Sequence, residues 1–204
     1  MDRPRAYLVD LLMATMNSIA TWASAAGDER IGLAWRDRVT QLMIAAGSYR
    51  PYEELIERAA RELNLDGGSP DALRTAWSEM EPWPDADALE HLDVPYAFVT
   101  NCSDDLARVA VHRSGLRPAF TLSAESAGWF KPSPEVYRSA SERIGFVPSK
   151  IQFIAGAPYD AHGASVASLR TVLVARRATL EAPMPDHIPV VHSLVQALAL
   201  DSGC

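Results

Sequence analysis

Short apolar runs alternate with stretches of helical periodicity along most of the chain. Runs rich in β-branched or aromatic residues lie at 6–10, 96–101, 120–125, 151–156 and 170–176. Between them, apolar residues recur at helical spacing in 103–116, 133–146 and 160–169. Strands that alternate with helices of this length are typical of βαβ units. We therefore expect an α/β fold, with a Rossmann-like parallel sheet that carries helices on both faces.

Residues 14–85 follow a different pattern. The segments 18–27, 31–47, 52–65 and 70–80 read as helices, and the turn signals "GDER", "SYRP" and "DGGSP" separate them. A helical block between the first and second strands indicates an inserted cap. We predict an α/β core domain of residues 1–13 and 86–204 and a helical cap domain of residues 14–85.

Composition narrows the possible partners. The 204 residues carry a formal net charge of −7 without a cluster of Lys or Arg, which argues against a nucleic-acid partner. No apolar run is long enough to span a bilayer, and the residues after Met1 do not resemble a signal peptide. The two cysteines, Cys102 and Cys204, favour neither a disulfide framework nor a zinc site. We expect a cytoplasmic protein with no membrane contact.

Chemically capable side chains follow several of the predicted strands. Asp10, Thr100, Asn101 and Asp160 lie at or just after strand ends, and Lys131 stands in "GWFKPSPEVY". Each has an ordinary structural explanation, since Asp and Asn cap turns and helices and a Lys before Pro is usually exposed. Parallel sheets, however, bind ligands at the carboxyl ends of their strands. Their joint occurrence in this order favours a functional site.

An acid, a hydroxyl with an amide, a lysine and a second acid in this order resemble the four motifs of the haloacid dehalogenase superfamily. The resemblance implies a haloacid dehalogenase-like fold, in which Asp10 is a catalytic nucleophile that forms a covalent ester. Thr100 and Asn101 then hold the anionic group of the substrate. Lys131 keeps the nucleophile ionised, and Asp160 orients the hydrolytic water together with Lys131.

The resemblance is strongest to the L-2-haloacid dehalogenase (type II) branch, which needs no metal and no cofactor. Phosphatases of the superfamily carry a second Asp where this chain has Leu12. The branch motifs correspond here to "LVD", "LAWRDR", "VTNCSDD", "FKPSPEVY" and "YDAHGA", from about residue 6 to about residue 176. The resemblance implies that Arg36 receives the departing halide and that Tyr159 takes a position often held by Trp. The backbone N–H groups of Leu11 and Leu12 would bind the substrate carboxylate.

Some positions depart from this pattern. The first loop reads Leu12-Met13-Ala14 where the branch usually has aromatic-Gly-Thr. Ala155 and Ala157 stand where the branch usually has Ser and Asn. The polar support around the nucleophile is therefore reduced. Trp22, Tyr49 and Tyr52 are residues for an apolar wall of the site or, equally, for the core of the cap.

Three hypotheses remain open at this point. The first is a cofactor-free hydrolase that displaces the C2 leaving group of a small 2-substituted carboxylic acid, as an (S)-2-haloacid dehalogenase does. The second uses the same nucleophile to open the ring of azetidine-2-carboxylate. The third is a non-catalytic binding protein that retains the pocket. A homodimer formed through the cap segment "TWASAAG" is a further possibility.

Overall fold

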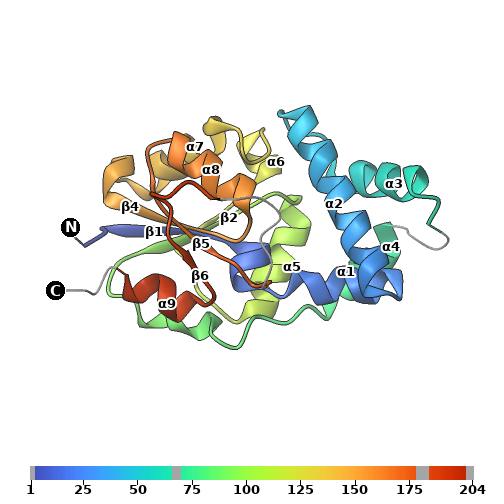
Figure 1. Cartoon of the computed structure of the whole chain (residues 1–204), viewed down its shortest axis with the longest axis horizontal. Coiled ribbons are helices and arrows are strands. Elements are labelled where there is room, and N and C mark those ends of the chain that lie inside the picture. The colour runs from blue at the N-terminus through green and yellow to red at the C-terminus, as the bar shows by residue number, and fades with distance from the viewer. Residues whose placement is uncertain (1–2, 66–69, 178–183, 201–204) are drawn as a thin grey trace.

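The computed structural model describes residues 3–65, 70–177 and 184–200. Six strands form one sheet in the order β3-β2-β1-β4-β5-β6, and each pair of neighbours is parallel (Figure 1). The strands are β1 (Ala6–Asp10), β2 (Tyr96–Thr100), β3 (Thr121–Ser123), β4 (Ile151–Ala155), β5 (Arg170–Val174) and β6 (Val190–Val191). This arrangement confirms the predicted α/β fold with a parallel sheet.

Helices cover both faces of the sheet, which explains why the central strands are mostly apolar. All five residues of β1, β2 and β4 are buried. Val9 packs in one apolar cluster with α5 (Asp104–Ser114) and α9 (Leu194–Ala199). Its neighbour Leu8 points to the other face, in a cluster with α7 (Pro134–Ile144) and α8 (Pro158–Val166). Figure 1 shows these two layers on opposite sides of the sheet.

The register of β1 brings the carboxyl ends of the central strands together. Asp10 pairs with Val99, and Val9 pairs with Ile154. The last residues of β1, β2 and β4 therefore lie at one edge. A five-residue turn of π-helix, η1 (Leu11–Thr15), follows β1 directly, and its first turn contacts this edge.

Four helices between β1 and β2 lie together beside the sheet in Figure 1. They are α1 (Ser18–Ala26), α2 (Glu29–Ala46), α3 (Tyr52–Glu62) and α4 (Pro70–Ser78). Helix α2 crosses α1 closely at Gly32, where a Cβ would lie 2.4 Å from the carbonyl oxygen of Trp22. The indole of Trp22 is only 2% exposed and packs edge-to-face on Trp35. It is therefore inside the helical block and is not available to a dimer partner.

The sequence prediction missed several short elements. These are β6, the helix α6 (Ala124–Ala127), the turns of 3-10 helix η2 (Ala86–His91) and η3 (Pro148–Lys150), and the π-helical turn η1. The run predicted as a strand over 120–125 is a strand only at Thr121–Ser123, because the chain turns into α6 at Ala124. Among the described residues, no helix is both long enough and apolar enough to cross a lipid bilayer.

Candidate active site

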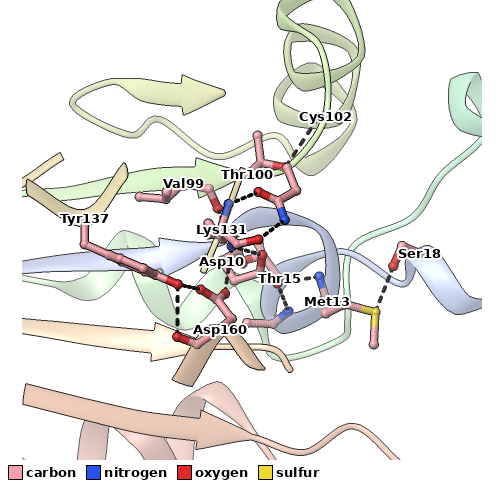
Figure 2. A network of polar contacts seen from close by, with 12 residues as sticks. Asp10, Met13, Thr15, Ser18, Val99, Thr100, Cys102, Lys131, Tyr137 and Asp160 are labelled. Atoms are coloured by element: carbon pink, nitrogen blue, oxygen red, sulfur yellow. Dashed lines mark hydrogen bonds and ion pairs between the residues drawn. The ribbon is translucent and has the colours of Figure 1, made fainter. Parts of the chain in front are cut away.

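Lys131 links two carboxylates at the edge of the sheet (Figure 2). Its Nζ donates to Asp10 Oδ1 at 2.7 Å and to Asp160 Oδ2 at 2.7 Å. A third bond, of 3.2 Å, goes to the carbonyl oxygen of Val99. An ammonium group has three N–H donors, so all of them are used. The Lys131 side chain is 1% exposed, which makes this a buried cluster with one positive and two negative groups.

The pKa of Lys131 reflects two opposing effects. Burial lowers it, but the nearby charges of Asp10 and Asp160 raise it by more, and the result lies above the ordinary value. Lys131 is therefore a permanent cation at physiological pH.

The Asp10 carboxylate is fixed on its other oxygen by the backbone of η1. Oδ2 accepts the N–H of Met13 at 2.8 Å and the N–H of Ala14 at 3.1 Å. The Thr15 hydroxyl donates to the Asp10 carbonyl oxygen at 3.0 Å. Asp10 thus caps η1, as an Asp at a strand end often does, and also presents its carboxylate to a charged partner. The capping role of Asp10 and its contact with Lys131 are therefore compatible.

Asp160, in the first turn of α8, is held by a tyrosine that the sequence prediction did not single out. The Tyr137 hydroxyl donates to Asp160 Oδ1 at 2.7 Å. Burial raises the pKa of Asp160 to about 6, while Lys131 counteracts part of this rise. Burial also raises the pKa of Tyr137 well above its ordinary value, so it is a neutral donor. The signal for Tyr137 was present in the motif "FKPSPEVY".

Asn101 and Thr100 use their polar groups within the protein. Asn101 binds the backbone of Lys131 twice, through Nδ2 to the carbonyl oxygen at 3.0 Å and through Oδ1 from the N–H at 2.7 Å. This pair of bonds fixes the segment that carries the lysine. Thr100 is fully buried, and its hydroxyl lies 3.4 Å from Cys102 Sγ. Burial raises the pKa of that thiol to about 12, which keeps it neutral.

A cavity of about 30 Å³ adjoins Asp10 beneath the helices α1 to α3. Its lining consists of Asp10, Leu12, Met13, Ser18, Trp22, Arg36, Thr40, Met43, Tyr52, Asn101, Ala157 and Tyr159. Six of the nine predicted site positions thus either line this cavity or bond directly to Asp10. Leu11, Thr100, Lys131 and Asp160 are buried and do not line it, and neither does Tyr49, which packs on Phe130.

Five of these six positions line the cavity directly, and the sixth, Lys131, reaches it through its bond to Asp10. Arg36 extends from α2 towards the cavity with its side chain 14% exposed. Its Nη1 lies 3.0 Å from Asp37 Oδ1. Tyr159 lines the same cavity, and burial raises its pKa to about 12, so the phenol is neutral. The cavity therefore combines a carboxylate, a guanidinium group and apolar walls.

Small residues after β4 let the chain pass directly over the nucleophile. A Cβ on Gly156 would lie 2.4 Å from Met13 Cβ and 2.5 Å from Asp10 Oδ2. Such distances are shorter than any real contact, so only glycine fits at this position. On each side of it, Ala155 and Ala157 contribute only methyl groups to this crowded loop.

A second network, which the sequence did not indicate, holds the nucleophile loop from outside. Arg176 Nε and Nη2 donate to the Ala14 carbonyl oxygen at 3.2 and 2.5 Å. The same guanidinium group forms a two-bond ion pair with Asp85, at 2.9 and 2.8 Å. Trp83 Nε1 donates to the Met13 carbonyl oxygen at 3.0 Å. These residues are far apart in sequence, so no local motif reports their meeting.

The carboxylates do not form a site that suits a divalent cation. All four of their oxygen atoms accept hydrogen bonds, from Lys131, Tyr137 and the N–H groups of η1. A magnesium ion needs several free oxygen ligands in octahedral geometry. Within residues 3–65, 70–177 and 184–200, no group of three or more His, Cys, Asp or Glu side chains is placed to hold a metal.

No family model matches the chain. Individual proteins of known function do resemble it, and those named here are dehalogenases. The (S)-2-haloacid dehalogenase 4A of Burkholderia cepacia is 28% identical over 203 residues, which cover 92% of this chain and 86% of that protein. The haloacetate dehalogenase H-2 of a Moraxella species is 25% identical over 189 residues, which cover 83% of this chain and 84% of that protein.

Solved structures agree in fold. The L-2-haloacid dehalogenase of Xanthobacter autotrophicus superposes with a TM-score of 0.84 at 20% identity, over 98% of this chain and 99% of that one. The same enzyme with chloropropionic acid covalently bound gives a TM-score of 0.83 at 19% identity, over 98% and 99% of the two chains. The motifs, the sheet and the curated relatives together support an assignment to the haloacid dehalogenase superfamily, in its L-2-haloacid dehalogenase branch.

Proposed function

We propose that this protein hydrolyses the carbon–halogen bond at C2 of a small 2-haloalkanoic acid, as an (S)-2-haloacid dehalogenase does, with Asp10 as the nucleophile. The observation that carries the proposal is the Lys131 ammonium group between Asp10 and Asp160, next to a cavity that Arg36 also lines. The names of the relatives supply the substrate class. No metal or cofactor takes part in the proposed reaction.

In the first step, a carboxylate oxygen of Asp10 forms a bond to C2 while the bond from C2 to the halogen breaks. The halide leaves with the bonding electron pair. Arg36 lines the same cavity and offers fixed N–H donors to the departing anion. Its pairing with Asp37 restrains the guanidinium group without occupying all of its donors. The product of this step is an ester between Asp10 and the substrate.

In the second step, water attacks the carboxyl carbon of Asp10, and the ester oxygen leaves with the 2-hydroxy acid. Negative charge develops on the carboxyl oxygen during this attack. The groups that hold Asp10 now, the Lys131 ammonium and the N–H groups of Met13 and Ala14, stand 2.7 to 3.1 Å from its two oxygens and can stabilise that charge. The water oxygen stays in the Asp10 carboxylate, one of the two water protons ends on the 2-hydroxy oxygen of the product, and the other proton is released.

Asp160 acts in this scheme through Lys131, because its carboxylate does not line the cavity. It fixes the ammonium position at 2.7 Å and is itself held by Tyr137. Asn101 fixes the backbone of the same lysine. The backbone N–H groups of Leu11 and Leu12, at the start of η1, are the proposed donors to the substrate carboxylate.

We assign the cap role to the helices α1 to α4, within the predicted cap of residues 14–85. Arg36, Trp22 and Tyr52 of this block line the cavity, while Asp10 comes from the sheet. Closure of the block over the sheet excludes bulk water from the displacement step. A cytoplasmic location and a homodimer remain part of the proposal. Size-exclusion chromatography with light scattering tests the dimer.

A substrate panel tests the function. The protein is incubated with (S)-2-chloropropionate, (R)-2-chloropropionate and azetidine-2-carboxylate, and chloride release and ring opening are measured, with Asp10→Asn as the control. We expect chloride from a chloropropionate and no ring opening, because a guanidinium group on the cavity repels a protonated ring nitrogen. Ring opening alone would establish the amine hypothesis. Binding without turnover of any of the three would establish the non-catalytic one.

A further inference from the structure

A second and larger cavity adjoins the one at Asp10. Its volume is about 310 Å³, roughly ten times the 30 Å³ of the first. Five residues line both cavities and form the wall between them: Met13, Arg36, Thr40, Ala157 and Tyr159. The larger cavity extends from this wall between α1 and α2 on one side and the loops after β4 and β5 on the other.

Part of the lining of the large cavity is hydrocarbon. Ile19, Leu33, Ile44 and Pro158 contribute apolar side chains to it. Its polar lining residues include Arg36, Asp37, Gln41, Arg176 and Arg177. Of these, Arg36 contacts Asp37, and Arg176 has its donors on Asp85 and on the backbone of Ala14. The hydrocarbon part of the lining offers an aliphatic group a surface to pack on.

Ala157 is the least bulky residue between the two cavities. Its methyl group is the smallest of the five side chains that separate the cavities. Of the five shared residues, Ala157 therefore leaves the most room for an alkyl chain that starts at C2 of a substrate beside Asp10 and extends into the larger cavity. A polar side chain of the size of Asn at this position would occupy that room.

We propose that the larger cavity, which we name the tail pocket, receives the alkyl substituent of the substrate, so that the enzyme prefers 2-haloalkanoic acids of about five to eight carbons over 2-halopropionate. This inference rests on the proposed function and specifies its substrate. Each methylene group that leaves water for an apolar pocket improves kcat/KM up to about fourfold. Three added methylenes therefore give a preference of about ten- to sixtyfold.

Two filling variants and one matched control test the tail pocket. Leu33→Trp and Ile44→Trp place an indole in its lining, whereas Ile31→Trp adds the same indole on α2 outside both cavities. The substrates are 2-bromopropionate and 2-bromohexanoate. We expect the wild type and Ile31→Trp to prefer the longer acid, and either filling variant to lower that preference at least tenfold.

Binding of unreactive acids separates this proposal from the proposed function. Calorimetry with propionate and octanoate measures the pocket without turnover. We expect octanoate to bind at least tenfold more tightly to the wild type and to lose this advantage in a filling variant. Equal binding of the two acids, or equal loss in Ile31→Trp and the filling variants, would overturn the tail pocket. Tight octanoate binding without halide release would instead retain the pocket and overturn the proposed reaction.

Discussion

Replacing Lys131 by Met should destabilise the fold and also abolish catalysis. The change keeps much of the side-chain length but removes the cation between Asp10 and Asp160. Three hydrogen bonds are lost, to Asp10, Asp160 and the Val99 carbonyl oxygen. Two buried carboxylates then lie close together without a counter-charge. Removal of one partner from a buried ion pair costs about 3–5 kcal/mol of unfolding free energy. We expect a loss of that size at pH 8.

The pH dependence of this loss has a definite sign. The pKa of Asp160 is already raised to about 6 by burial, and without Lys131 burial acts on it with less opposition. A carboxyl whose pKa is higher in the folded than in the unfolded state lowers stability above its folded pKa. That loss diminishes as the pH falls and the folded state takes up the proton. The deficit of Lys131→Met relative to the wild type should therefore be smaller at pH 5 than at pH 8.

Urea unfolding followed by circular dichroism measures both effects, at pH 5 and at pH 8. Lys150→Met is the matched control, since Lys150 is the other lysine of the chain and lies far from the site in the 3-10 turn before β4. We expect little change from it at either pH. A Lys131→Met protein as stable as the wild type at pH 8 would show that the buried cluster is not held by this charge. A deficit that is equal at both pH values would refute the role of Asp160 in it.

Three further predictions concern the cavity. Gly156→Ala should lower kcat at least a hundredfold in an otherwise folded protein, because its methyl group would lie 2.5 Å from Asp10 Oδ2; near-normal kcat would show that the two loops separate easily. The kcat/KM should fall as the pH drops through about 6, because Asp160 takes up a proton there; a profile flat to pH 5 would contradict this. Arg36→Ala should lower kcat and kcat/KM together, more for a chloro than for an iodo acid; an unchanged kcat on a 2-haloacid would exclude Arg36 from halide release.

The sheet was predictable because each strand carries its own local signal. The buried runs at 6–10, 96–100 and 151–155 are mostly apolar, as expected for strands covered on both faces, and each contains one polar or charged residue, namely Asp10, Thr100 or Gln152. Strand β6 was not predictable, because a strand of two residues, Val190 and Val191, is too short to show a periodic pattern. The π-helical turn η1 has no sequence signal either, because the side chain of Asp10 and the contacts of the loop determine its geometry.

The candidate site was predictable to the extent that its residues belong to ordered motifs. Asp10, Lys131 and Asp160 meet in space because the strand ends and the helix start carry them to one edge. The hydrogen-bond partners of the site residues were harder to predict from the sequence. Asn101 binds the backbone of Lys131, and Thr100 lies against Cys102. Both contacts depend on the direction in which the backbone turns after β2, and the sequence does not indicate this direction. The contact of Arg176 with the nucleophile loop joins segments that no pattern connects.

The covalent role of Asp10 is the central claim, and isotope labelling tests it most directly. The protein is incubated with 2-chloropropionate in water enriched in heavy oxygen, and the peptide that contains Asp10 is analysed by mass spectrometry. If water attacks the Asp10 carboxyl carbon, heavy oxygen enters the Asp10 carboxylate over repeated turnovers, and the lactate of the first turnover carries the original protein oxygen. Halide release with heavy oxygen only in the product and none in Asp10 would contradict the account.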